Sequence, residues 1–180
     1  HSVEEARLYS IKLRQILRYL GVSSGDMEKG AMRFEANISM RPQGSTNLSQ
    51  PRTEVKNLNS LLAMVHATEY EIARQTKILE RGGTVDQETM GWDEARNQTY
   101  TQRSKEEAHD YRYFPEPDLP RLEVSRTWVD EIRSRLPELP DEKRDRFVTE
   151  YGLSSYDASV IIAEKEIAEY FDAAVTAGKE

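Results

Sequence analysis

Apolar and polar residues alternate without interruption from Met32 to Arg41. The apolar set comprises Met32, Phe34, Ala36, Ile38 and Met40, and the polar set comprises Arg33, Glu35, Asn37, Ser39 and Arg41. Because successive side chains of a strand point to opposite faces, this period of two predicts a β-strand with one core face. The polar face is either simply hydrated, which is the usual case, or suited to phosphate or a carboxylate-bound metal.

A second strand and a long helix are expected after the turn-rich loop that ends at Pro51. The strand is predicted over residues 53–57, and the helix continues from residue 61 until Gly82-Gly83 ends it. Either Asn59 or Ser60 would cap this helix. Backbone N–H groups at such a junction can hold an anion, although ordinary capping explains much of the same composition.

Two further strands are predicted at residues 84–92 and 97–103, joined by a turn at 93–97. Their alternation and turn residues are typical of an antiparallel hairpin. Trp92 and Tyr100 are expected to pack across the strands rather than to form a stacking platform.

Helical spacing of apolar residues predicts an N-terminal helix over residues 3–20, with Ser2 and Glu5 as a capping box and Gly21 at its end. Four short helices are predicted at 125–136, 141–151, 154–163 and 164–177, with Ser125, Asp141 and Ser154 as N-caps. Strands followed by a run of helices indicate an α+β fold, in which a mainly antiparallel sheet flanked by helices precedes a small all-α segment. The expected domains are residues 1–120 and 121–180.

Residues 103–120 gather charged, aromatic and proline residues into a run with neither a helical stripe nor a long alternation. Pro115, Pro117 and Pro120 preclude a continued helix or a central strand. The segment is therefore either a binding surface or a solvated loop followed by a proline-rich hinge, and its residues leave both interpretations open.

Composition narrows the class of protein. The chain has 180 residues, of which 37% are hydrophobic and 32% charged, and its net charge is −7. The lack of cysteine excludes disulfides and thiolate sites, and no apolar run is long enough to span a membrane. The negative charge argues against a generic electrostatic grip on nucleic acid, but not against an RNA held mainly by a partner. The absence of a signal peptide predicts a cytoplasmic protein, and the missing initiator methionine predicts a fragment.

Candidate chemistry rests on carboxylates beside cations on the predicted strands, because Walker, nucleophile-elbow, zinc-finger and dinucleotide motifs are absent from the sequence. Glu35 lies near Arg33, Glu54 lies near Lys56, and Glu88 is a further carboxylate. Hard oxygens on rigid strands suit a Mg²⁺-nucleotide site whose phosphates are bound by cations. Spacing alone does not separate such a site from surface ion pairs.

The stretch Ser104-Lys-Glu-Glu-Ala-His-Asp-Tyr-Arg-Tyr-Phe-Pro-Glu-Pro-Asp-Leu-Pro120 resembles the GatB family, the tRNA-binding subunits of the bacterial and organellar glutamyl/aspartyl-tRNA amidotransferases. Blocks at residues 27–39, 54–60, 87–89, 136–140 and 156–158 agree with the same family in order and spacing. The resemblance covers essentially the whole chain, so coincidence is a poor explanation of it.

The resemblance implies an enzyme that converts tRNA misacylated with Glu or Asp into Gln-tRNA or Asn-tRNA. The GatB-type subunit would bind the aminoacylated tRNA and phosphorylate the side-chain carboxylate with ATP and Mg²⁺. Ammonia from the glutaminase (amidase) subunit would then displace the phosphate, and a small third subunit would complete the complex. The implied catalytic domain is an α+β cradle similar to glutamine synthetase, followed by helical and tail domains.

The resemblance also implies roles for individual residues. Glu35 and Glu54 are expected to support Mg²⁺, and Lys56 and Arg112 to neutralise phosphate charge during phosphoryl transfer. The expected cofactor-binding residues are Arg33, Asn57, Asn59, Arg103 and Tyr113, and the remaining polar positions that match are Asn37, Asp110 and Tyr111. Position 35 departs from the family, which usually has Asp there, and the longer Glu weakens the case for direct ligation.

The N-terminal half of the family, with its His and Glu metal ligands, has no counterpart in this sequence, and neither does the tRNA-gripping tail. The chain alone is therefore expected to be inactive. A second hypothesis treats it as a docking module for tRNA and the amidase subunit without chemistry of its own. Convergence of Glu35 and Lys56 in a cleft would favour the catalytic hypothesis, and divergence into solvent would favour the module.

Overall fold

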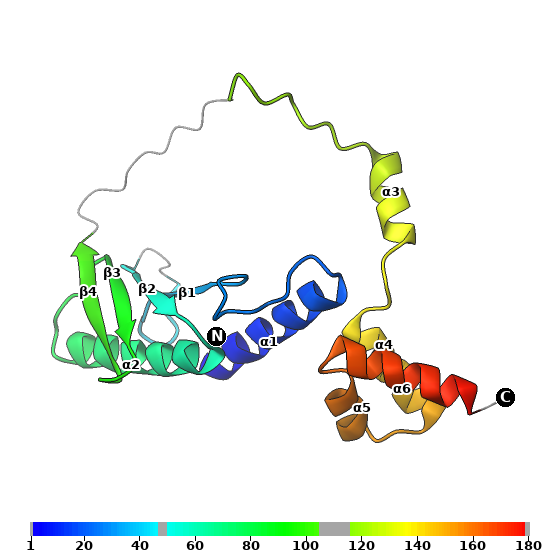
Figure 1. The fold of residues 1–180 in the computed structure, drawn as a ribbon. Coiled ribbons are helices and arrows are strands. Elements are labelled where there is room, and N and C mark those ends of the chain that lie inside the picture. Colours follow the sequence, from blue (N-terminus) through cyan, green and yellow to red (C-terminus); the bar gives the residue numbers. More distant parts are fainter. Residues whose placement is uncertain (1, 47–49, 105–115, 179–180) are drawn as a thin grey trace. The chain divides into compact units, whose positions relative to one another are not determined.

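The computed structural model describes residues 2–46, 50–104 and 116–178, and it confirms the α+β fold (Figure 1). The elements of the sheet-containing part are α1 (Val3–Tyr19), β1 (Phe34–Ile38), β2 (Thr53–Leu58), α2 (Leu61–Glu80), β3 (Glu88–Asp93) and β4 (Gln98–Ser104). The later helices are α3 (Arg126–Ser134), α4 (Pro140–Tyr151), α5 (Ser155–Ile161) and α6 (Lys165–Ala177). Within the described ranges, no helix is long and apolar enough to cross a membrane.

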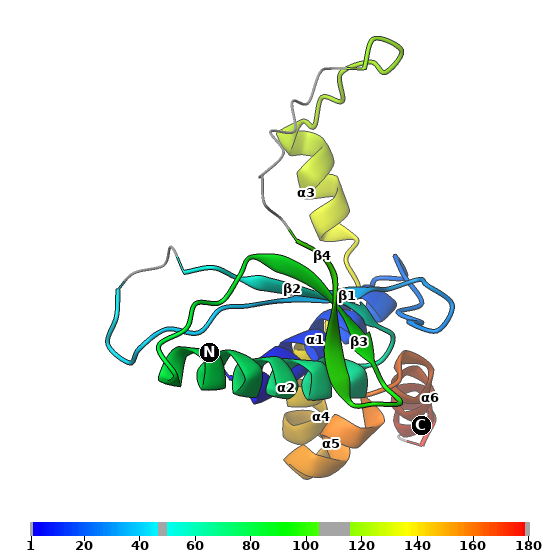
Figure 2. The same ribbon diagram turned by 90° about the vertical axis from the view of Figure 1, so that its left-hand side faces the viewer.

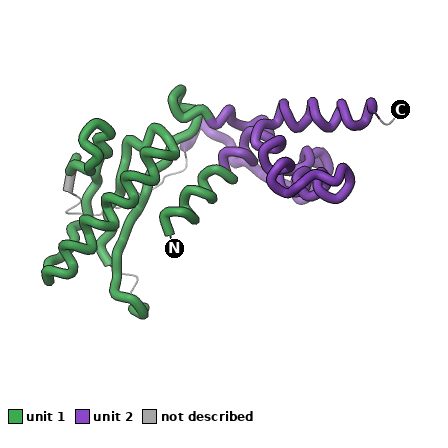
Figure 3. Tube along the Cα trace, turned by 90° about the horizontal axis from the view of Figure 1, so that it is seen from below, with its two compact units in different colours: residues 1–12, 26–109 green, residues 13–25, 110–180 purple. Residues whose placement is uncertain are grey.

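The chain divides into two compact units (Figure 3). The sheet unit comprises residues 1–12 and 26–109, and the helical unit comprises residues 13–25 and 110–180, so that the division runs through α1. The expected domain division at residues 120 and 121 stays a prediction.

The sheet has the strand order β1-β2-β3-β4. The β1–β2 and β3–β4 pairs are antiparallel and the β2–β3 pair is parallel, which agrees with a mainly antiparallel sheet. Helix α2 runs along one face (Figures 1 and 2). The buried core on this face consists of Ile38, Val55, Leu58, Ala63, Met64, Ala67, Met90 and Trp92. The opposite face of the sheet carries Glu35 and Asn37 of β1 and Glu54 and Lys56 of β2.

The predicted elements are confirmed with shifted ends. The alternating run at 32–41 is a strand only from Phe34 to Ile38, and the strand expected from residue 84 begins at Glu88. Ser60 caps α2 by accepting a hydrogen bond from the backbone N–H of Ala63 at 2.9 Å. The N-cap expected at Asp141 is wrong, because α4 begins one residue earlier at Pro140 with Leu139 as its N-cap. Proline suits this position since its missing N–H has no partner in the first helical turn.

A buried polar network joins α2 to the sheet. Glu71 is fully buried and accepts hydrogen bonds from Arg74, from Gln75 Nε2 at 3.1 Å and from Thr99 Oγ1 at 3.1 Å. Gln75 is also fully buried; it donates to the carbonyl of Ile38 at 3.2 Å and accepts from the backbone N–H of Met40 at 3.1 Å. The end of β1 is thereby held by the helix.

The helical unit has an aromatic core of its own. Phe147 is fully buried, and its ring lies 5.3 Å from that of Tyr151 and 5.2 Å from that of Phe171, measured between centroids. The hydroxyl of Tyr19 donates to the carbonyl of Ile162 at 2.8 Å, which ties the last turn of α1 to the end of α5. Burial raises the pKa of the Tyr19 phenol to about 12, with nearby carboxylates contributing.

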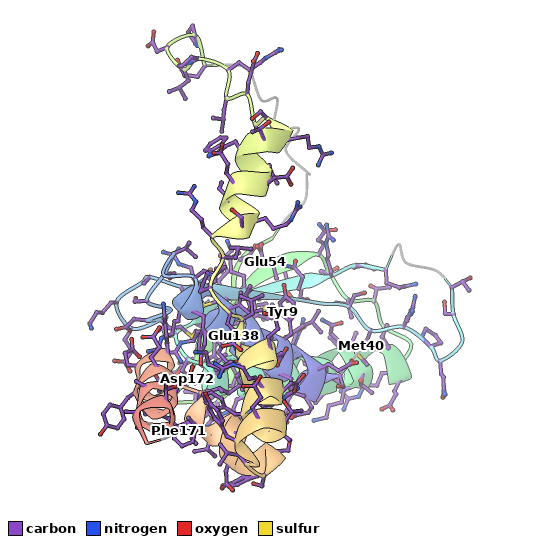
Figure 4. All side chains as sticks on the ribbon, turned by 90° about the vertical axis from the view of Figure 1, so that its right-hand side faces the viewer. Tyr9, Met40, Glu54, Glu138, Phe171 and Asp172 are labelled. Atoms are coloured by element: carbon purple, nitrogen blue, oxygen red, sulfur yellow. The ribbon has the colours of Figure 1, made fainter. Side chains whose placement is uncertain are left out.

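In the helical unit, Arg146 forms ion pairs with two carboxylates. The guanidinium of Arg146 donates to Glu138 at 2.8 Å and to Asp172 at 2.7 and 2.9 Å, and both carboxylates are labelled in Figure 4. Hydrogen bonds from Arg146 hold the pKa of Glu138 and of Asp172 below their ordinary values, and the hydroxyl of Tyr151 adds to the effect at Asp172. Both carboxylates therefore prefer the ionised form in the folded unit.

Acid is expected to weaken the helical unit through these two carboxylates. Because their folded pKa values are depressed, the stability they contribute is complete above the unfolded values of about 4 and is lost as the pH falls through the folded values. Asp172→Asn should flatten the dependence of the unfolding free energy on pH below about 4. Urea unfolding of Asp172→Asn and of the unaltered chain, followed by circular dichroism at pH 3 and pH 7, measures this.

The matched control is Asp130→Asn, because Asp130 pairs with Arg133 on α3 and both side chains are about two-thirds exposed. Exposed pairs contribute little to stability, so this change should leave the acid dependence as it is. An identical acid dependence for Asp172→Asn and the unaltered chain would contradict the assignment.

Candidate functional site

Four polar residues of β1 and β2 lie on the open face of the sheet, away from α2. Glu35 and Asn37 come from β1, and Glu54 and Lys56 come from β2. The Nζ atom of Lys56 lies 3.3 Å from Glu35 Oε1 and 3.6 Å from Glu54 Oε1. The ammonium group is thus bracketed by two carboxylates from neighbouring strands, as alternation and an antiparallel register require.

Asn57 breaks the alternation of β2. Its backbone has a φ of 63°, in the left-handed region that Asn tolerates better than most residues. Asn57 therefore shares the open face with the preceding Lys56, while the next residue, Leu58, is almost fully buried in the core. The consecutive residues Lys56 and Asn57 therefore both have their side chains on the open face of the sheet.

A cavity of about 350 Å³ lies where these strands meet the segment before β1. It is lined by Met27, Glu28, Gly30, Met32, Arg33, Glu35, Lys56, Asn57, Leu58 and Asn59. Five of the lining residues were predicted from the sequence as site residues: the carboxylate of Glu35, the cations of Arg33 and Lys56, and the amides of Asn57 and Asn59. Glu35 and Lys56 converge in this cleft.

Several predicted residues lie elsewhere. Glu54 stands beside the cavity on β2, where its carboxylate accepts from Thr89 Oγ1 at 3.4 Å. Arg103 is on β4, opposite Thr89 in the register. Glu88 does not join Glu35 and Glu54, because it faces α2. Its carboxylate accepts hydrogen bonds from Arg74 of α2 and from Thr101 of β4.

Some predicted residues cannot be placed. Asp110, Tyr111, Arg112 and Tyr113 lie outside the described residues. The phosphate-binding role expected of Arg112 and the cofactor contact expected of Tyr113 stay predictions.

The donor set fits a magnesium ion that arrives with a nucleotide better than a pre-formed metal centre. In the described part of the chain, no group of three or more His, Cys, Asp or Glu side chains gathers as a metal site. Mg²⁺ is usually held by one or two carboxylates, with phosphate oxygens and water completing its shell. Glu35 and Glu54 would supply the two carboxylates if Mg²⁺ were bound, and Lys56 lies between them.

Tyr100 packs across the strands over Gly91, as the sequence predicted, whereas Trp92 packs on α2. Trp92 and Tyr100 do not pack against each other: Trp92 pairs with Thr99 and is buried edge-on against Tyr70 of α2, with ring centroids 6.2 Å apart. Tyr100 pairs with Gly91 on the open face, where Asn57 Nδ2 donates to its hydroxyl at 3.3 Å. The sequence feature that indicates this position of Tyr100 is Gly91 on the neighbouring strand, because a residue without a side chain leaves room for the tyrosine ring.

Comparison with known proteins gives a consistent result. A family described as the GatB/GatE catalytic domain matches residues 1–130. The B subunit of the aspartyl/glutamyl-tRNA(Asn/Gln) amidotransferase from Herpetosiphon aurantiacus is 56% identical over 176 residues, covering 97% of this chain and 36% of that protein. The proteins of the same name from Dehalococcoides mccartyi and Carboxydothermus hydrogenoformans are 55% and 54% identical, over 94% and 95% of this chain. The chain spans about a third of the length of these relatives.

Proposed function

Since this chain belongs to the GatB/GatE catalytic-domain family, we propose that it supplies part of the ATP-dependent site of a glutamyl/aspartyl-tRNA amidotransferase. In the proposed reaction, a side-chain carboxylate oxygen of Glu or Asp on the misacylated tRNA attacks the γ-phosphorus of ATP. The bond to the bridging oxygen breaks, and an acyl phosphate and ADP are formed. Ammonia then displaces the phosphate, giving the amide.

The observation that carries the proposal is the convergence of Lys56, Arg33 and Glu35 on one cavity. Phosphoryl transfer demands positioning and charge neutralisation more than covalent chemistry, and cations beside carboxylates provide both. In this proposal Lys56 and Arg33 bind phosphate oxygens, and Asn57 and Asn59 donate hydrogen bonds to the nucleotide. Glu35 and Glu54 would hold Mg²⁺, which when bound neutralises charge on the transferred phosphoryl group.

The rest of the machinery is proposed to come from other parts of the complete protein and its partners. The chain matches about a third of its relatives' length, so residues 1–180 alone are expected to lack amidotransferase activity. The proposed partners are an amidase subunit that supplies ammonia, a small third subunit and the aminoacylated tRNA.

Calorimetric titration of Mg-ATP into the complete subunit tests the proposal. We expect Lys56→Ala and Glu54→Ala each to weaken Mg-ATP binding at least tenfold, because each removes a charge that faces the phosphates or their metal, worth about 1.5–3 kcal/mol. Glu35→Ala should give a similar loss. Repeating the titration with residues 1–180 alone shows whether these strands bind nucleotide without the rest of the protein.

Glu94→Ala is the matched control, since Glu94 is an exposed carboxylate in the turn between β3 and β4. This variant should bind Mg-ATP as the unaltered subunit does. Unchanged affinity in all three site variants would overturn the proposed site, and activity of residues 1–180 alone on Glu-tRNA would overturn the expected inactivity.

A docking role is the second candidate, and helix α3 favours it. Trp128, Ile132 and Leu136 follow at intervals of four residues along and just beyond this helix, and each is between 42% and 50% exposed. None of the residues of α3 is buried within the part of the chain that the structure describes. An apolar stripe at helical spacing suits a groove on a partner protein.

A further inference from the structure

Tyr100 is fixed above β3 by a glycine. Gly91 pairs with Tyr100 in the β3–β4 register, and a Cβ atom built on Gly91 would lie 2.4 Å from Tyr100 Cζ and 2.6 Å from its hydroxyl oxygen. The tyrosine ring therefore occupies the space that a side chain at position 91 would fill. In the parallel β2–β3 register, Gly91 pairs with Lys56, so Lys56, Gly91 and Tyr100 form a row across three strands.

The hydroxyl group of Tyr100 receives two amide donors. Asn57 Nδ2 donates to it at 3.3 Å, and Gln102 Nε2 donates at 3.4 Å. A phenolic hydroxyl has two lone pairs and one hydrogen. When both lone pairs accept from N–H groups, the hydroxyl hydrogen remains available for donation, and any further partner of the hydroxyl must be an acceptor. Tyr100 as a whole is 43% exposed, so the residue is accessible to a ligand.

The surroundings favour an anionic acceptor. Asn57 contacts Tyr100 and also lines the cavity with Lys56 and Arg33. A hydrogen bond to a charged oxygen is stronger than one to a neutral oxygen. Lys56 is paired with Glu35 and Glu54, so Arg33 and Lys56 would attract such an oxygen once the Mg²⁺ of the nucleotide neutralised these carboxylates.

We propose that Tyr100 is a ligand-binding residue that donates its hydroxyl hydrogen to a phosphate oxygen of the nucleotide. Gly91 is the residue that makes this possible, and Asn57 orients the phenol. The inference rests on the proposed function, because it assigns a further contact within the same nucleotide site.

Tyr100→Phe in the complete subunit tests the contact, because it removes the hydroxyl and keeps the ring above Gly91. We expect the Kd for Mg-ATP to rise roughly tenfold with the melting temperature unchanged, since one hydrogen bond to a charged oxygen is lost. Affinity for adenosine, which has no phosphate, should stay the same. Tyr170→Phe is the matched control, because Tyr170 is 78% exposed in the helical unit and should change neither quantity.

Gly91→Ala provides a second route to the same contact without removing a polar atom. The added methyl group displaces the tyrosine ring, so Mg-ATP binding should weaken, and the double variant Gly91→Ala/Tyr100→Phe should bind no more weakly than Gly91→Ala alone. Additive losses would contradict a shared mechanism.

The outcomes separate this proposal from the function on which it rests. An unchanged Kd in Tyr100→Phe beside a large loss in Lys56→Ala overturns the role of Tyr100 and leaves the nucleotide site standing. Weaker binding of adenosine by Tyr100→Phe overturns the phosphate contact and indicates that the hydroxyl contacts the base or the ribose. Absence of Mg-ATP binding by the unaltered complete subunit overturns both proposals.

Discussion

Replacing Glu71 by alanine is expected to lower the free energy of unfolding of the sheet unit by about 3 kcal/mol. The Glu71 carboxylate is fully buried and accepts hydrogen bonds from Arg74, Gln75 and Thr99. Alanine would leave a half-buried guanidinium and two buried polar groups without this acceptor, and each uncompensated group carries a desolvation penalty. Chemical unfolding followed by tryptophan fluorescence measures the loss, because Trp92 lies in the same unit.

Glu69→Ala is the matched control, since Glu69 lies on the same helix and is exposed. Surface substitutions of this kind usually change stability by no more than about 0.5 kcal/mol. Glu71→Gln should fall between the two, because the amide keeps an acceptor oxygen but loses the charge. A loss below about 1 kcal/mol in Glu71→Ala would show that the network is not a major source of stability.

Phe147→Ala is expected to destabilise the helical unit by about 3–5 kcal/mol, enough to unfold many units of this size. The Phe147 ring is fully buried against Tyr151 and Phe171, and Arg146 lies over it with its Cζ atom 5.2 Å from the ring centroid. Alanine removes these contacts and leaves a cavity that rigid helices fill only in part. Thermal unfolding followed by the helical circular dichroism signal measures the effect.

Tyr170→Ala is the control for loss of an aromatic ring, because Tyr170 lies on α6 and is 78% exposed. We expect little change in this variant and an intermediate loss in Phe147→Leu, which keeps most of the apolar volume. If Phe147→Ala melted at the same temperature as Tyr170→Ala, the aromatic cluster would not be the core of this unit.

The sequence predicted those features that depend on near neighbours in the chain. Alternation around Phe34 and Ile38 located β1 and its polar face. Ser154 was correct as a cap, and of the two caps offered for α2, Asn59 and Ser60, the structure has Ser60; such predictions are possible because capping acts over only three residues. The pairing of Glu54 with Lys56 was visible from their spacing on one strand, and the structure brings Glu35 to the same ammonium group.

The features that sequence reasoning missed depend on register and on backbone conformation. Alternation along β2 assigns Asn57 to the face opposite Lys56. The left-handed backbone conformation of Asn57 places its side chain on the same face as Lys56, and this conformation was not predicted from the sequence. The position of Tyr100 follows from its pairing with Gly91, in the register that runs without a shift from the turn between β3 and β4. Glu71 looks like an ordinary surface residue in the sequence, and only the packing of α2 on the sheet buries it.

The hold of Gln75 on the end of β1 has a consequence for self-association. β1 lies at one edge of the sheet, and edge strands offer unpaired backbone groups to the strands of other molecules. The Gln75 side-chain amide donates to the carbonyl of Ile38 and accepts from the N–H of Met40, as the peptide group of a neighbouring strand would. A helix side chain thus satisfies two backbone groups where β1 ends, and these two groups are not available to a strand of another molecule.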